Sequence, residues 1–243
     1  MSENQNEINL NFKNFKTPGL YLIFKDGSKL VLTIENIEKT VKEFWDNPAK
    51  ITDSVKKAAD FQRCTFCPLK GKESMCDAIR PTIPFLSVVD KYVSFDEVAA
   101  VFVGDDCMLR VSNTTMQEAL KYVSILGLMH FCQKGKTYWK YFYGINPLMN
   151  ATEIAGRLYL NLYFINNGDR GKIKDMVTRF YQEITASCKN QVARMNLVCK
   201  NDAFMNSFVN TQVAAMFLTM DMDKKLEESI NKFGESYKKV IIN

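Results

Sequence analysis

The sequence contains a single histidine among its 243 residues, so histidine-based chemistry is nearly absent. A Ser–His–Asp triad and an HExxH zinc protease site both need histidine in a fixed context, and neither motif occurs. The glycine-lysine segments at 71–73 and 171–173 lack the spacing and the Ser or Thr of a phosphate-binding loop. We therefore expect that the protein is not an enzyme.

Long apolar runs are also missing. No stretch approaches the roughly 18 apolar residues of a membrane-spanning helix, and residues 1–16 are polar, with no apolar signal region. These absences predict a cytoplasmic protein without a membrane span. Seven cysteines in such a chain indicate reduced thiols or metal ligands in place of a disulfide framework.

The hydrophobic periodicity predicts an α+β fold. Pairs of β-rich runs flank short turns, and the first turn carries Asp26-Gly27, a strong hairpin signal. The two predicted β-hairpins comprise the runs 20–24 with 29–35 and 97–103 with 107–111. A helical pattern over 36–60, interrupted at Pro48, and the cysteine-rich segment connect them. The expected result is one small antiparallel sheet with a cysteine knuckle.

The sequence from residue 115 onward is helical in pattern. Thr115 with Glu118, and Asn150 with Glu153, have the spacing of capping boxes. A long helix follows Asp169 and is followed by two more. Its apolar stripe comprises Ile173, Val177, Phe180, Ile184, Cys188, Val192, Met195 and Cys199. We expect a sheet module over 1–113 packed on a helical bundle over 114–243, together one compact unit.

Three cysteines form the most informative motif. Cys64 and Cys67 have CxxC spacing, and Cys76 follows after a flexible basic stretch. A CxxC turn supplies half of many zinc and iron–sulfur sites, and nearby Arg63 and Lys70 favour the thiolate form. We predict a metal site, most simply structural zinc, with an iron–sulfur cluster or a thiol–disulfide switch as alternatives.

Tetrahedral zinc needs a fourth ligand in addition to these three thiolates. The candidates are Cys132, Cys107, His130 and Asp77. Cys132 is the first choice because it lies at the end of a predicted helix, where its side chain can reach a neighbouring turn.

The same residues resemble a known family. The string CTFCPL beginning at Cys64, the following Cys76, the segment 93–98 and the segment 125–132 are similar to an uncharacterised bacterial family of unknown function. The resemblance covers roughly residues 60–165 and implies that Cys132 is the fourth member of the cysteine set. It implies no activity. Residues 134–139 depart from the family, which is richer in Pro and His there.

Residues 134–143 interleave lysines with five aromatic side chains. Aromatic rings can stack on bases while lysines neutralise phosphates, so a second alternative is a regulator that binds single-stranded nucleic acid. Its binding residues would be Lys134, Lys136, Tyr138, Trp139 and Lys140. The leading hypothesis remains a metal-stabilised scaffold or regulatory protein that acts through a protein partner or self-assembly.

Overall fold

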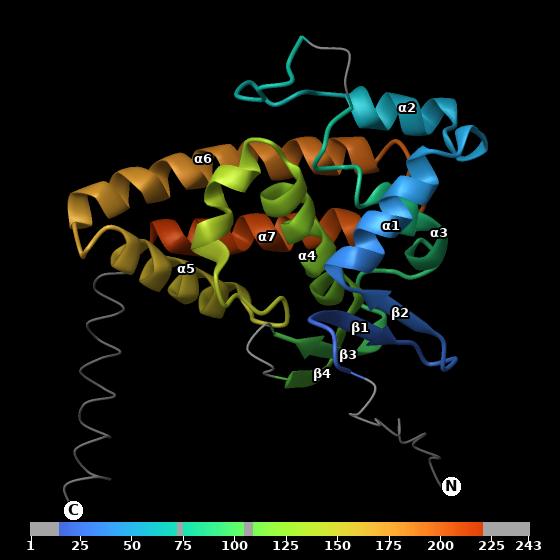
Figure 1. Cartoon of the computed structure of the whole chain (residues 1–243), viewed down its shortest axis with the longest axis horizontal. Coiled ribbons are helices and arrows are strands. Elements are labelled where there is room, and N and C mark those ends of the chain that lie inside the picture. The colour runs from blue at the N-terminus through green and yellow to red at the C-terminus, as the bar shows by residue number, and fades with distance from the viewer. Residues whose placement is uncertain (1–14, 72–74, 105–108, 221–243) are drawn as a thin grey trace, which may run out of the picture.

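The computed structural model describes residues 15–71, 75–104 and 109–220 and confirms the α+β class. Helices fill most of the molecule, and one antiparallel sheet lies at one end of the helical layer (Figure 1). Each helix within the described part of the chain is too short or too polar to cross a bilayer.

The sheet has four strands in the order β2-β1-β3-β4, and every neighbouring pair is antiparallel. The strands are β1 (Gly19–Ile23), β2 (Lys29–Leu32), β3 (Glu97–Val103) and β4 (Leu109–Thr115). The strand β4 begins two residues later than the predicted run. Residues 105–108, with Cys107 among them, lie outside the described residues.

The connection between β1 and β2 follows from its turn residues. Gly27 has a φ of +79°, which glycine adopts without steric cost. The Phe24 N–H donates to the Ser28 carbonyl at 2.9 Å, and Asp26 accepts from the Ser28 backbone N–H. The sequence of this turn therefore specifies the local pairing of the first two strands.

One face of the sheet packs on the helices. Leu20 and Leu22 of β1 are fully buried, and their antiparallel partners Phe102 and Ala100 lie on the same face. Helices α1 and α4 contact this sheet, and their buried side chains complete the same core. The alternation of side chains along β1 and β3 thus places a hydrophobic surface under the helical layer.

Short helices connect the first two strands to the last two. They are α1 (Ile34–Trp45), η2 (Pro48–Lys50), α2 (Asp53–Asp60), η3 (Ile83–Phe85) and α3 (Leu86–Val89). Thr33 and Thr52 cap α1 and α2 by accepting backbone N–H groups. The predicted interruption at Pro48 is confirmed, because a separate short helix begins there.

The remaining helices form the bundle. They are α4 (Met116–Leu126), the π-helical turn η4 (Gly127–Phe131), η5 (Gly135–Phe142), α5 (Ala151–Ile165), α6 (Arg170–Met195) and α7 (Ala203–Thr219). Helix α7 packs against α4, α5 and α6 (Figure 1). The hydrophobic core is continuous from Leu20 in β1 to Leu218 in α7.

The two predicted capping boxes have different outcomes. Asn150 and Glu153 form the complete box at the start of α5. The Thr115 side chain caps nothing, and its hydroxyl is buried without a hydrogen bond. Instead, the N–H groups of Met116 and Gln117 donate to the carbonyls of residues 96 and 94. A tertiary contact therefore replaces the local cap.

The predicted apolar positions of the bundle helices are mostly buried. Two are exceptions, since Ile165 is 41% exposed and Met216 is 39% exposed. Both lie on surfaces that no neighbouring helix of the described chain covers enough to bury them. The predicted last helix, over residues 226–237, lies outside the described residues.

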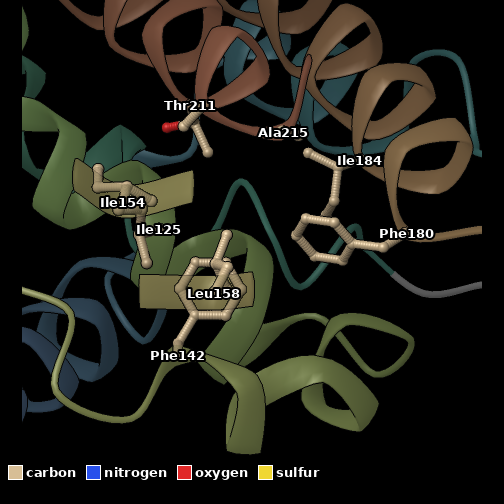
Figure 2. Close-up of a pocket in the computed structure, with 9 residues that line it drawn as sticks. Ile125, Phe142, Ile154, Leu158, Phe180, Ile184, Thr211 and Ala215 are labelled. Carbon is tan, nitrogen blue, oxygen red and sulfur yellow. The ribbon is translucent and has the colours of Figure 1, made fainter. Parts of the chain in front are cut away.

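A small apolar cavity lies inside the bundle. Its volume is about 10 Å³, and its walls come from α4, η5, α5, α6 and α7 (Figure 2). Phe142 and Leu158 face Phe180 and Ile184 across it. Since a cavity of this size has room for about one water molecule and its walls are apolar, it is a packing gap and not a ligand site.

Candidate metal site

The CxxC segment follows α2 and lies across α6 (Figure 1). The Cys67 N–H donates to the Cys64 carbonyl at 3.0 Å, and the Lys70 N–H donates to the Cys67 carbonyl at 3.1 Å. Two successive turns therefore place Cys64 and Cys67 at the ends of one tight loop. Both side chains are half-buried.

The sulfur of Cys64 rests against α6. The side-chain amide of Asn190 donates to Cys64 Sγ at 3.3 Å, and the Ser187 hydroxyl lies 3.8 Å from the same sulfur. Hydrogen bonds to sulfur stabilise thiolates and orient them. Helix α6 therefore supplies polar contacts to the first predicted ligand.

Cys76 is also buried against α6, where it contacts the residue that follows Asn190. Its backbone N–H donates to the Ala59 carbonyl at 2.8 Å, which ties it to the end of α2. The Gln191 side-chain amide lies 3.7 Å from Cys76 Sγ. Cys64 and Cys76 thus contact consecutive residues of α6, Asn190 and Gln191.

Cys132 approaches from the bundle, directly after the turn η4. Burial raises the pKa of its thiol, while the backbone N–H groups of Gly135 and Lys134 lower that pKa by donating to the sulfur. Charge on Cys76 and Cys64 raises the pKa further. Cys132 therefore lies in the same region of the molecule as Cys76 and Cys64.

At two glycines in this region, the backbone passes very close to a carbonyl group of another segment. A Cβ on Gly135 would lie 1.5 Å from the Leu128 carbonyl oxygen, and one on Gly127 would lie 2.5 Å from the Ala78 carbonyl oxygen. Gln133 donates to Asp77 at 3.0 Å, which joins the neighbours of Cys132 and Cys76. Glycine at these positions lets the segments that carry Cys76 and Cys132 come together.

The predicted set is only partly assembled in this structure. Cys64 and Cys76 lie against α6, and the hydrogen bond from Gln133 to Asp77 joins the segment of Cys132 to that of Cys76. Across the described residues, no three histidine, cysteine, aspartate or glutamate side chains converge closely enough to hold a metal ion. The described geometry therefore does not form a metal site in which three of the predicted ligands already converge.

The other candidate fourth ligands have different surroundings. His130 Nε2 lies 3.6 Å from Glu38 Oε1, and its ring packs against Phe131 and Trp139. Asp77 accepts from Gln133. Of the described candidates, Cys132 is the one whose side chain is placed beside other cysteines.

Two further cysteines are on the predicted apolar stripe of α6 and its extension. Cys188 is fully buried, and the pKa of its thiol is raised by burial and by charge on Cys64. Burial and the charge of Asp90 raise the pKa of Cys199 to about 12. Such pKa values keep both thiols protonated and unreactive near neutral pH.

The sequence did not reveal the polar residues of α6 that contact the cysteines. Ser187, Asn190, Gln191 and Arg194 recur at helical spacing, and such a pattern is usually a solvated face. Here Ser187, Gln191 and Arg194 are buried. A buried polar stripe becomes recognisable only when the element that covers it is known.

The basic aromatic segment is largely part of the bundle. Tyr138 is buried, its ring packs edge-on against Phe180, and its hydroxyl donates to Glu183. Lys134 pairs with the same Glu183 at 3.1 Å. Tyr138 therefore offers no open face to a base, and the nucleic-acid alternative depends on the exposed residues Lys136, Trp139 and Lys140.

A surface groove adjoins the cysteines. Its volume is about 310 Å³, and its lining includes Asp77 and Gln133, which directly follow Cys76 and Cys132. The remaining lining residues are Glu38, Val41, Lys42, Asp46, Arg80, Phe131 and Lys136. Any change in how the cysteine segments are held would therefore alter one wall of this groove.

Comparison with known proteins identifies no relative: no family model, curated protein or solved structure matches the chain. The resemblance carried by the cysteine segment stays a prediction.

Proposed function

We propose that the chain is a zinc-stabilised, non-catalytic protein that acts by binding a protein partner. The observation that carries the metal part is that Cys64 and Cys76 lie against α6 while the Gln133–Asp77 hydrogen bond joins the segments of Cys132 and Cys76. Cys64 and Cys76 belong to the segment that joins α2 to η3, which we call the connector. Cys132 follows η4, at the end of the first bundle helix.

The donors suit zinc. Thiolates in a four-coordinate set are a common structural zinc site, and hydrogen bonds to sulfur are typical of its surroundings. Cys64, Cys67, Cys76 and Cys132 would hold the ion, with Cys67 reached by rotation within its turn. Zinc would supply a cross-link between the connector and the bundle. No reaction is assigned to it.

Metal content tests this proposal directly. The protein would be purified anaerobically without chelator, analysed for bound elements and compared with Cys64→Ser, Cys132→Ser and the remote control Cys199→Ser. We expect about one zinc ion per chain in the wild type and the control, and little zinc in the first two variants. Absence of metal from a folded wild type would contradict the proposal.

An iron–sulfur or redox sensor is the second candidate. Amide or hydroxyl groups approach the sulfurs of Cys64, Cys76 and Cys132, and such hydrogen bonds also tune cluster potentials. Iron together with a brown absorbance would support this reading over zinc. A colourless zinc protein whose thiols show no reversible oxidation would contradict it.

The proposal that the protein binds a partner is based on the surface groove beside the cysteines. Among the groove residues, Lys42 and Lys136 form no ion pair with any described residue, and neither does Asp46. Asp77 and Glu38 already contact other side chains. The lining carries three basic and three acidic side chains, so its formal charge is zero, and Lys42 and Lys136 are the described cations of the groove without an ion pair. We propose that these two lysines bind an acidic peptide segment of a partner.

Binding of a fluorescein-labelled oligoglutamate peptide tests this surface. We expect Lys42→Gln with Lys136→Gln to weaken binding roughly tenfold and added salt to weaken wild-type binding. The control Lys57→Gln with Lys140→Gln removes the same charge from exposed positions outside the groove. Equal weakening by both pairs would show non-specific attraction and contradict the assignment.

A further inference from the structure

Arg194 is the largest fully buried side chain of the described residues, and it lies on α6 beside the cysteine connector. Its Nε donates to the Phe61 carbonyl at 2.6 Å, and its Nη2 donates to the Gln62 carbonyl at 2.9 Å. These carbonyls come just before Cys64 in the chain. Arg194 therefore holds the entry to the CxxC turn.

The backbone at this entry is constrained. Gln62 has a φ of +46°, in the left-handed region that a residue with a side chain rarely adopts. The guanidinium fork fixes the two carbonyls on either side of that conformation. The direction in which the chain enters the Cys64 turn thus depends on Arg194 as well as on local turn residues.

Among the described residues, no carboxylate balances the charge of Arg194. Both of its hydrogen bonds go to neutral carbonyls, its Nη1 atom is buried without a hydrogen bond, and no carboxylate of a described residue pairs with it. A buried cation is costly unless a counter-charge compensates it. An uncompensated charge at this position therefore calls for an anion nearby.

Lys121, the other fully buried cation of the described residues, has a carboxylate that compensates its charge. Lys121 is 1% exposed, and its ammonium lies 2.5 Å from Glu118 and 2.8 Å from the Met149 carbonyl. Lys121 has a carboxylate, whereas Arg194 has none among the described residues. What lies next to Arg194 along α6 is the pair Asn190 and Gln191, which contact the sulfurs of Cys64 and Cys76.

We infer that Arg194 is a positioning residue whose charge balances the thiolates of the cysteine site. This inference rests on the proposed metal site: four thiolates around a divalent ion keep a net negative charge, which a neighbouring guanidinium stabilises. Arg194 then has two roles. Its two hydrogen bonds hold the connector on α6, and its positive charge stabilises the cysteine site when zinc is bound.

The test separates charge from hydrogen bonding. Arg194→Lys keeps the charge but not the fork, while Arg194→Gln keeps an N–H donor but not the charge. Lys121→Gln is the control for losing a buried cation elsewhere. Zinc affinity would be measured by chelator competition, the Co²⁺–thiolate absorption band would report ligand geometry, and circular dichroism would check folding.

We expect Arg194→Gln to weaken zinc binding roughly 10- to 100-fold, the range typical when an outer-shell partner of a metal site is lost. Arg194→Lys should restore most of the affinity, and Lys121→Gln should leave affinity unchanged while lowering stability. Unchanged affinity in Arg194→Gln, or equal weakening in Arg194→Gln and Arg194→Lys, would overturn the inference.

Two further outcomes are distinguishable. Failure of the wild type to take up zinc or Co²⁺ would refute the proposed metal site itself, whatever the variants do. Glu73, between Cys67 and Cys76, lies outside the described residues. If Glu73→Gln lowered stability in chelator as much as Arg194→Gln does, Arg194 would be paired with that carboxylate and the inference would be wrong. If Arg194→Gln did not fold, the comparison of Arg194→Lys with the wild type would decide.

Discussion

The two halves of α6 are stabilised in different ways. In the first half, Ile173, Val177 and Phe180 are buried in the apolar core of the bundle. In the second half, Gln191 and Arg194 are equally buried but contact sulfurs and carbonyls, and each retains a polar atom without a partner. The buried surface of the first half is therefore apolar, whereas that of the second half includes polar groups.

This difference suggests how stability is divided. Apolar burial is favourable in any folded state, because it depends only on excluding water. Buried polar groups stabilise only when their partners are present. We therefore expect the bundle to be stable with or without metal and the connector to depend on metal.

The largest expected effect is the removal of a metal ligand. Cys132→Ser should lower the free energy of unfolding of the zinc-loaded protein by about 5 kcal/mol, because metal binding energy is also folding energy. Urea unfolding with and without chelator would measure it. In chelator, the variant and the wild type should differ by much less; an equal loss in both conditions would contradict metal dependence.

A truncation in the first half of α6 should behave differently. Phe180→Ala removes a ring that packs against Tyr138 and Phe142 and enlarges the small cavity beside it. We expect a loss of about 3–5 kcal/mol. The loss should be the same with zinc and with chelator, as measured by paired urea titrations. A loss of stability that differed between zinc and chelator would contradict the expectation that the first half of α6 is stable without metal.

The close approach at Gly135 should be sensitive to one methyl group. Gly135→Ala places a Cβ 1.5 Å from the Leu128 carbonyl oxygen, so the turn after Cys132 must shift. We expect a loss of about 3 kcal/mol, together with weaker zinc binding. Thermal melts and chelator competition would measure the two effects.

Gly156 provides the matched control for that substitution. It lies within α5, and a Cβ there would meet nothing within 4 Å. Gly156→Ala should therefore raise stability by about 0.5–1 kcal/mol through helix propensity, with no change in zinc affinity. Destabilisation by both substitutions would show that the space around Gly135 is not the cause.

The smallest expected effect is the pH dependence of Cys199. Its pKa is raised by burial to about 12, so the folded state favours the protonated thiol. The stabilisation is present at neutral pH and is lost as pH rises from about 9 towards about 12. Metal-free wild type should therefore lose more stability than Cys199→Ala between these pH values. Parallel urea-unfolding curves for the two proteins would contradict the assignment.

Part of the candidate site could be predicted from the sequence. The spacing of Cys64, Cys67 and Cys76 indicates a turn and a ligand set without any knowledge of the fold, since CxxC geometry is local. The choice of Cys132 as the fourth ligand stays a prediction, since a hydrogen bond between Gln133 and Asp77 joins its segment to that of Cys76 but no shared ligand geometry is formed. The contacts of Asn190 and Arg194 could not be predicted, because polar residues on a helix look the same whether water or another segment covers them.

The sequence by itself determined the features that depend on a few neighbouring residues. These include the Asp26-Gly27 turn, the capping box at Asn150 and Glu153, and the break at Pro48. Each follows from backbone sterics or from a hydrogen bond within one turn, so distant residues have little influence on it.

The tertiary structure decided the features that depend on what lies opposite. Backbone carbonyls at 94 and 96 replaced the predicted Thr115 cap, because they reach the first N–H groups of α4. Met216 is exposed and Arg194 is buried, contrary to their hydrophobicity, since burial depends on the covering segment. Contacts between distant segments depend on how the whole core packs, so the sequence of a single segment cannot predict them.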